Sequence, residues 1–233
     1  MSAAQPDFDA RDIKLVVFDV DGTLYSQSAL RLRMLPELLV LAFSIQGRAQ
    51  LKIIATYRRL REAYAGRELE GFGAALIEDT ATAAACKPEA ARETIEEWIY
   101  RRPLRHLKAC VLAEVPELFT SLKTAGKIIG IFSDYAAEAK LDAMGLTADV
   151  IASADDANVA LLKPNPKGLQ SLMQKTGAQP NETLLIGDRD ERDGEAARRA
   201  GVHALIRSSK PLAEFRTFGN YTDPVFATLT AAR

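Results

Sequence analysis

The second half of the chain alternates between short apolar runs and amphipathic stretches. The apolar runs have the length and composition of buried parallel strands, and they lie at 127–132, 150–153, 183–186 and 203–207, with an earlier one at 13–18. The stretches between them have apolar residues at helical spacing and end at glycines that suit helix C-termini: Gly126, Gly145, Gly177 and Gly201. This alternation predicts an α/β fold, in which right-handed crossovers place helices on both faces of a parallel sheet.

Residues 27–105 show a different pattern, with no convincing strand. Helical segments follow one another there and are interrupted at Gly47, at Gly66, around 71–73 and at 87–88. We therefore expect an all-α insert of three or four helices after the first strand. The chain then divides into a Rossmann-like core (12–26 and 106–233), the helical insert (27–105) and a flexible N-terminal tail (1–11). Residues 208–233 are too weakly patterned to place.

The composition is that of an ordinary soluble globular protein, with a net charge of −1 and 48% hydrophobic residues. Nothing in it points to a nucleic-acid partner. The longest apolar run, 38–43, is far too short to span a membrane. Residues 1–11 lack the apolar segment of a signal peptide, and the two cysteines, Cys86 and Cys110, have no metal-binding spacing and suit a reduced thiol pair. We expect a cytoplasmic protein.

Polar side chains follow the predicted strands at the points where they end. Parallel strands have their carboxyl ends at one edge of the sheet, which is where ligands bind in open α/β sheets. Gly22, in the first of these turns, tolerates a positive φ or a close backbone approach. The residues expected to meet at this edge are Asp19, Asp21, Ser133, Asp134, Lys163, Asp188 and Asp193.

This set of residues suits phosphoryl transfer. Asp19 can act as a nucleophile and form an aspartyl-phosphate. Its charge repels a phosphate, so a cation has to offset both. Asp188, with Asp193, can hold Mg²⁺ together with Asp19, because that ion prefers hard oxygen ligands, and the ion orients the phosphate for in-line attack.

The remaining residues complete the chemistry. Lys163 supplies a second positive charge, and the Ser133 hydroxyl can donate to a phosphate oxygen. Backbone N–H groups at Gly22 and Asp134 are placed to complete an anion site. Asp21 can protonate the leaving oxygen and then take a proton from the water that hydrolyses the intermediate.

These motifs resemble those of the haloacid dehalogenase-like (HAD) hydrolase superfamily. The four appear in order: DVDGT at 19–23, Ser133 after an apolar strand, Lys163 in a Lys-Pro-Asn-Pro segment, and Gly187-Asp188 followed by Asp193. The resemblance covers roughly residues 12–207, and the helical insert lies where that family places its C1 cap.

The resemblance implies a role for each motif. Asp19 would be the nucleophile and Asp21 the acid/base, with Mg²⁺ bound by Asp19, the Asp21 carbonyl and Asp188, and Asp193 supporting directly or through water. Dehalogenases of the family lack the second aspartate, so Asp21 favours phosphate chemistry. The expected activity is a Mg²⁺-dependent phosphatase acting on a small-molecule phosphomonoester similar to phosphoglycolate, a sugar phosphate or a nucleotide.

Two alternatives are also compatible with these motifs. A phosphomutase of the same superfamily uses the same four motifs but returns the phosphoryl group to its product. A phosphate-binding or phospho-accepting switch also combines an acidic Mg²⁺ pocket with Ser and Lys. The long helical insert and the general acid Asp21 favour an enzyme that turns over.

The first half of the insert is basic, with eight Lys or Arg and two Glu in residues 28–67. A solvated basic face is one interpretation. Another is that one or two arginines clamp a substrate carboxylate or a second phosphate, and a third is contact with a membrane surface or a partner. Residues 35–45 are apolar on more than one face, which suits a substrate pocket or a homodimer interface.

Overall fold

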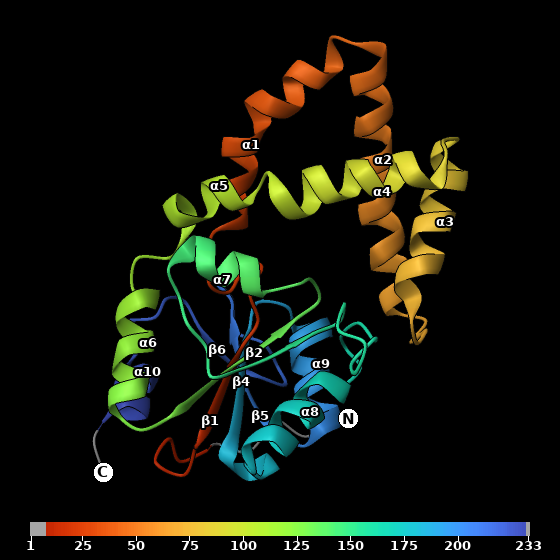
Figure 1. Cartoon of the computed structure of the whole chain (residues 1–233). Coiled ribbons are helices and arrows are strands. Elements are labelled where there is room, and N and C mark those ends of the chain that lie inside the picture. The colour runs from red at the N-terminus through yellow and green to blue at the C-terminus, as the bar shows by residue number, and fades with distance from the viewer. Residues whose placement is uncertain (1–7, 232–233) are drawn as a thin grey trace.

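The computed structural model describes residues 8–231 and contains a six-stranded parallel sheet (Figure 1). The strand order is β3-β2-β1-β4-β5-β6, so the first strand is central and the chain reverses direction across the sheet between β1 and β4. The strands are β1 (Leu15–Phe18), β2 (Ile128–Ser133), β3 (Val150–Ser153), β4 (Thr183–Gly187), β5 (His203–Arg207) and β6 (Arg216–Phe218). This order brings the ends of β1, β2 and β4 side by side.

Helices cover both faces of the sheet. Val16 and Phe18 of β1 pack in one hydrophobic core with α6, α7 and α10, whereas Leu15 and Val17 pack in another with α8 and α9. The core helices are α6 (Val115–Thr124), α7 (Glu138–Met144), α8 (Lys167–Thr176), α9 (Glu195–Ala200) and α10 (Pro224–Thr230), with short turns η2 (Lys108–Cys110), η3 (Pro180–Glu182) and η4 (Asp190–Gly194). The predicted α/β fold is confirmed.

The segment after β1 is helical throughout. Its elements are α1 (Gln27–Ala42), α2 (Ile45–Ala65), α3 (Phe72–Ala84), α4 (Pro88–Ile95), η1 (Glu96–Arg101) and α5 (Leu104–Leu107). The insert has its own core, which includes Tyr57, Leu76 and Trp98, and two residues of the α/β core, Ala154 and Leu162, join it. No described helix combines the length and the apolar character needed to cross a bilayer. The exact boundary of the insert as a domain stays a prediction.

The predicted helix break at Gly47 is wrong. The break lies at Phe43–Ser44, and Ser44 caps α2 by accepting a hydrogen bond from the N–H of Gly47 (2.9 Å). Gly47 lies in the first turn of α2, where the end of α1 at Leu41 approaches so closely that there is no room for a side chain. A Cβ at this position would be 2.1 Å from the carbonyl oxygen of Leu41.

The C-terminal region that the sequence left unplaced contains β6 and α10. β6 has only three residues and lies at the edge of the sheet, so it carries no apolar run to reveal it. The Tyr221 hydroxyl, between β6 and α10, donates to the Thr23 carbonyl (2.9 Å) and supports the turn after β1. Most of the expected flexible tail, residues 1–7, lies outside the described residues, whereas Ala10 is buried in the core.

Candidate active site

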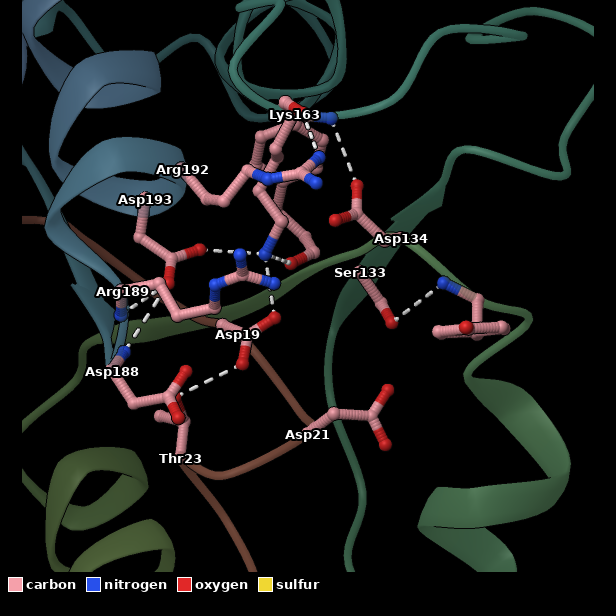
Figure 2. Close-up of polar contacts among 12 residues, drawn as sticks. Asp19, Asp21, Thr23, Ser133, Asp134, Lys163, Asp188, Arg189, Arg192 and Asp193 are labelled. Atoms are coloured by element: carbon pink, nitrogen blue, oxygen red, sulfur yellow. Dashed lines mark hydrogen bonds and ion pairs between the residues drawn. The ribbon is translucent and has the colours of Figure 1, made fainter. Parts of the chain in front are cut away.

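Asp19 follows β1 directly and lies at the carboxyl edge of the sheet (Figure 2). Its N–H donates to the Ile186 carbonyl of β4 (2.9 Å), which fixes the backbone where the strand ends. The carboxylate accepts hydrogen bonds from the Thr23 hydroxyl (3.0 Å) and the Lys163 ammonium (2.5 Å). Asp19 is only 5% exposed, so one oxygen of the candidate nucleophile is oriented by a hydroxyl and the other by a cation.

Lys163 is the central cation of the site. Its ammonium, 2% exposed, donates to Asp19, to Asp193 (2.6 Å) and to the Phe132 carbonyl (3.3 Å). Burial would lower the pKa of Lys163, but the carboxylates of Asp19 and Asp193 outweigh it and raise this pKa above its usual value. The lysine is therefore charged and neutralises part of the acidic cluster.

Three carboxylates, those of Asp19, Asp188 and Asp193, offer oxygens that lie within 4.8 Å of one another. Asp193 is already occupied, because it accepts from Lys163 and from the N–H groups of Asp188 (3.2 Å) and Arg189 (3.1 Å). The carboxylate of Asp188 makes no hydrogen bond or ion pair with the residues that the structure describes. Burial, aided by Asp193, raises the pKa of Asp188 to about 6.

The donor set suits a hard divalent cation. The three acids outnumber Lys163, which pairs with two of them, and burial raises the pKa of Asp19 well above its usual value even though Lys163 lowers it. Gly22, at φ +99°, lies against Asp188 so closely that a Cβ would be 2.0 Å from its Oδ2. Asp19 and Asp188 would therefore hold Mg²⁺, with Asp193 orienting the loop. The Asp21 carbonyl, a third predicted ligand, accepts a hydrogen bond from the Gln27 side chain (2.8 Å).

The side chain of Asp21 stands apart from this network (Figure 2). Both oxygens of its carboxylate accept a hydrogen bond from the Lys140 ammonium of α7 (2.7 and 2.6 Å). One of them also accepts a hydrogen bond from the Tyr25 hydroxyl. Burial alone would raise the pKa of Asp21, but the ion pair with Lys140 and these hydrogen bonds hold it below its usual value. The predicted general acid is thus ionised in this arrangement.

Ser133 is the last residue of β2 and Asp134 follows it, on the side of β1 opposite β4. The Ser133 hydroxyl is fully buried and accepts from the N–H of Tyr135 (3.2 Å), which leaves its proton free to donate. The Asp134 carboxylate accepts from the N–H of Lys163 (2.8 Å), so its side chain positions the lysine loop. Binding of phosphate by the Asp134 N–H stays a prediction.

Two neighbouring residues of α2 connect the insert to the edge of the sheet. Arg61, 4% exposed, donates to the carbonyl of Asp134 and to Asp155 (2.9 Å). Glu62 pairs with both Arg189 (3.0 Å) and Arg192 (2.5 Å). The insert therefore contacts the loop after β2 and the loop after β4 through adjacent side chains.

A cavity of about 410 Å³ lies between the insert and the loop after β3. The ring of Tyr135 lies close to a cation of each region: the Arg61 guanidinium, which lines the cavity, is 4.1 Å from the ring centre, and the Lys140 ammonium, which binds Asp21, is 4.9 Å from it. The volume is sufficient for a small metabolite. Its walls include Tyr57, Arg61, Phe72, Arg92, Tyr100 and Asp155.

A family model described as haloacid dehalogenase-like hydrolase matches residues 13–201, which is most of the chain and includes the four motifs. The chain belongs to this family. The resemblance identified from the motifs is therefore confirmed, and the protein is a HAD-like hydrolase. A search of the curated proteins found no match.

Solved structures with this fold include a phosphatase and a dehalogenase of the HAD family. A HAD phosphatase from Thermococcus onnurineus is 20% identical, with a TM-score of 0.64, over 91% of this chain and 96% of its own. The putative HAD-hydrolase YfnB from Bacillus subtilis, bound to magnesium, is 15% identical, with a TM-score of 0.65, over 94% and 99%. A 2-haloacid dehalogenase from Pseudomonas syringae pv. Tomato DC3000 is 18% identical, with a TM-score of 0.58, over 92% and 98%. At these identities the likeness concerns the fold alone.

Sequence reasoning missed three parts of this HAD-like site. Lys140 and Tyr25 bind Asp21, and Arg192 donates to the Lys163 carbonyl (2.7 Å) from a buried position. Both are close to a motif in sequence: Tyr25 lies two residues after the DVDGT motif, and Lys140 lies in the helix that follows Ser133. The only signal for Lys140 was a charge on a helix that the fold packs against the sheet.

Proposed function

We propose that this protein is a Mg²⁺-dependent phosphatase that hydrolyses a small-molecule phosphomonoester through an aspartyl-phosphate on Asp19. The observation that carries this proposal is the second carboxylate, Asp21, held by Lys140 and Tyr25 beside the candidate nucleophile. A halide leaves without a proton, whereas the alkoxide of a phosphate ester needs one. A held acid/base pair therefore supports ester hydrolysis over dehalogenation.

The residues around Asp19 suit attack on a phosphorus atom. Lys163 and the Ser133 hydroxyl would bind phosphate oxygens, while Thr23 keeps one carboxylate oxygen of Asp19 in place. Mg²⁺ held by Asp19 and Asp188 would neutralise charge on the phosphate. Burial of Asp19 and Lys163 would limit the access of water to the nucleophile during attack.

Asp21 would carry the proton, and Lys140 would position it. An incoming phosphate is a like charge that raises the pKa of Asp21, so Asp21 would take a proton from solvent while the ion pair with Lys140 holds its carboxyl group in place. Asp21 then protonates the leaving oxygen. In the second half-reaction, the low pKa keeps Asp21 ionised so that it can accept a proton from the hydrolytic water.

The helical insert would act as a cap over this chemistry. The cavity lined by Arg61 and Tyr100 would receive the part of the substrate that does not react, and its lining would select among phosphate esters. A cytoplasmic location fits a small metabolite substrate and belongs to the same proposal.

The test is phosphate release from a broad panel of phosphorylated metabolites, with Mg²⁺ and with EDTA. Mg²⁺-dependent release from a few related esters supports the proposal. Halide release from 2-haloacids without phosphate release would assign the protein to the dehalogenases instead. Transfer of phosphate between positions of one sugar would indicate a phosphomutase.

Lys140→Met is expected to lower kcat by about 10- to 100-fold, because Asp21 loses the ion pair that orients it. The acid limb of the pH profile of kcat should move to higher pH, since Lys140 is what holds the pKa of Asp21 low. Steady-state rates across pH measure both effects. Lys140→Arg, which keeps the charge, should restore the position of the acid limb; an unmoved limb in Lys140→Met would contradict the assigned role.

Mg²⁺ should stabilise the protein more at about pH 7.5 than at about pH 5. Without metal, the pKa of Asp188 is raised from 3.8 to about 6 in the folded protein. The protonated form is thus favoured by folding, and this contribution is lost as pH rises through about 6. Above that pH, Mg²⁺ offsets the charge of the ionised Asp188 carboxylate. Below it, Mg²⁺ has to compete with a proton for the same carboxylate. Thermal unfolding with MgCl₂ or EDTA measures the difference, and Asp188→Asn should abolish it.

A further inference from the structure

Helix α1 carries a row of exposed apolar side chains that the proposed function does not use. Phe43 is 87% exposed, Leu32 70% and Leu39 54%, with Leu35 also exposed. Their spacing of three and four residues places the three leucines on one face of α1, and Phe43 continues this row directly after the last helical residue. Met34 is the only buried residue of α1 and points to the opposite side. We call Leu32, Leu35, Leu39 and Phe43 the apolar stripe.

The stripe lies on a part of the molecule that projects away from the sheet. In Figure 1, α1 runs from the sheet to the far end of the insert and turns there into α2. The corner between the two helices is well fixed, because Ser44 caps α2 and Gly47 allows close contact with Leu41. Val40 and Ile45, 70% and 82% exposed, extend the apolar surface at this corner.

The charges around the stripe are positive. Arg31 and Arg33 flank it on either side of α1, and Arg48 and Lys52 follow the corner, all four exposed. No acidic residue occurs between Glu37 and Glu62. Glu37, the single acid of α1, is turned to the inner side, where it pairs with Arg102 (2.9 Å) and His106 (2.7 Å).

We propose that α1 docks this protein on an anionic lipid surface, lying parallel to the membrane with its apolar stripe among the headgroups. An exposed apolar face bordered by Arg and Lys is the pattern of interfacial helices. The long arginine side chains can reach lipid phosphates while their stems cover apolar surface.

A second copy of the chain is a poorer occupant. A helix of 16 residues is about 24 Å long and about 10 Å wide, so the stripe offers roughly 240 Å² to a partner. A stable interface buries about 800 Å² on each side. Pairing two stripes would also bring the flanking arginines of both copies together.

The test is flotation of the full chain with vesicles of phosphatidylcholine, with and without phosphatidylglycerol, at low and high salt. We expect salt-sensitive binding to the anionic vesicles only. Leu39→Ser/Phe43→Ser should weaken the partition constant at least tenfold. Arg31→Gln/Arg33→Gln should weaken it about fivefold for each charge. These side chains are exposed, and circular dichroism checks that the fold is kept.

Matched controls separate the stripe from surface properties in general. Leu69→Ser removes an exposed leucine at the other end of the insert, and Lys87→Gln/Lys108→Gln removes two exposed charges elsewhere. Both should bind vesicles as the wild type does. Equal loss in the controls, or no binding to anionic vesicles, would overturn the proposal. A wild-type dimer that Leu39→Ser/Phe43→Ser converts to a monomer would also overturn it and assign the stripe to an interface between copies.

Discussion

Asp19→Asn should lower kcat for phosphate release by at least about 10⁴-fold. The amide is a poor nucleophile, yet it has nearly the volume of the carboxylate and can still accept the hydrogen bond from Thr23. Purified variant and wild type are compared on the best ester of the panel. The fold should survive, which circular dichroism and the unfolding midpoint check.

Asp12→Asn is the matched control, because Asp12 is an exposed aspartate just before β1. It should leave the rate unchanged. Wild-type rates in Asp19→Asn, with a substrate that the protein turns over, would rule out the covalent mechanism. If both variants lose activity equally, the loss reflects damage to the strand instead of the nucleophile.

Lys163→Met should cost about 3–5 kcal/mol of unfolding free energy, because it leaves Asp19 and Asp193 buried without their cation. For a chain of this size, that corresponds to a fall of about 10 °C in Tm. Activity should be lost as well. Urea unfolding and a thermal scan without metal measure the change.

Lys14→Met provides the comparison, since Lys14 also forms an ion pair (2.5 Å to Glu182) but is largely exposed. Such pairs contribute about 0–1 kcal/mol. Adding Asp19→Asn to Lys163→Met should recover part of the loss by removing one unpaired charge. An equal loss of unfolding free energy in the two lysine variants would show that burial does not increase the contribution of the Lys163 ion pairs.

The strands that carry the site could be predicted because each is a buried apolar run with a polar residue at its end. Parallel pairing then fixes which ends meet, because Phe18 pairs with Ile131 and with Ile186. Asp19 is therefore level with the residues just before Ser133 and Asp188. The sequence order of the motifs therefore suffices to bring these residues together. Their roles in catalysis remain predictions.

Contacts that depend on tertiary packing could not be predicted from the sequence. Lys140 meets Asp21 only because α7 packs over the end of β1, and nothing in the local sequence signals that distance. The wrong break at Gly47 has a similar origin, since a glycine that permits close packing has the same local signature as one that ends a helix. β6 was missed because an edge strand needs little apolar character.

Arg61 and Glu62 have a kinetic consequence. Asp19 and Lys163 are almost inaccessible, and we expect α2 to move when a substrate enters. One displacement of α2 would break the contacts of both Arg61 and Glu62. The side chain of Glu62 is 59% exposed, so salt screens its pairs with Arg189 and Arg192, whereas Arg61 is buried and shielded. We therefore expect higher ionic strength to speed the movement of α2 away from the site. If product release limits turnover, kcat should rise with salt concentration until salt weakens the binding of the phosphate itself.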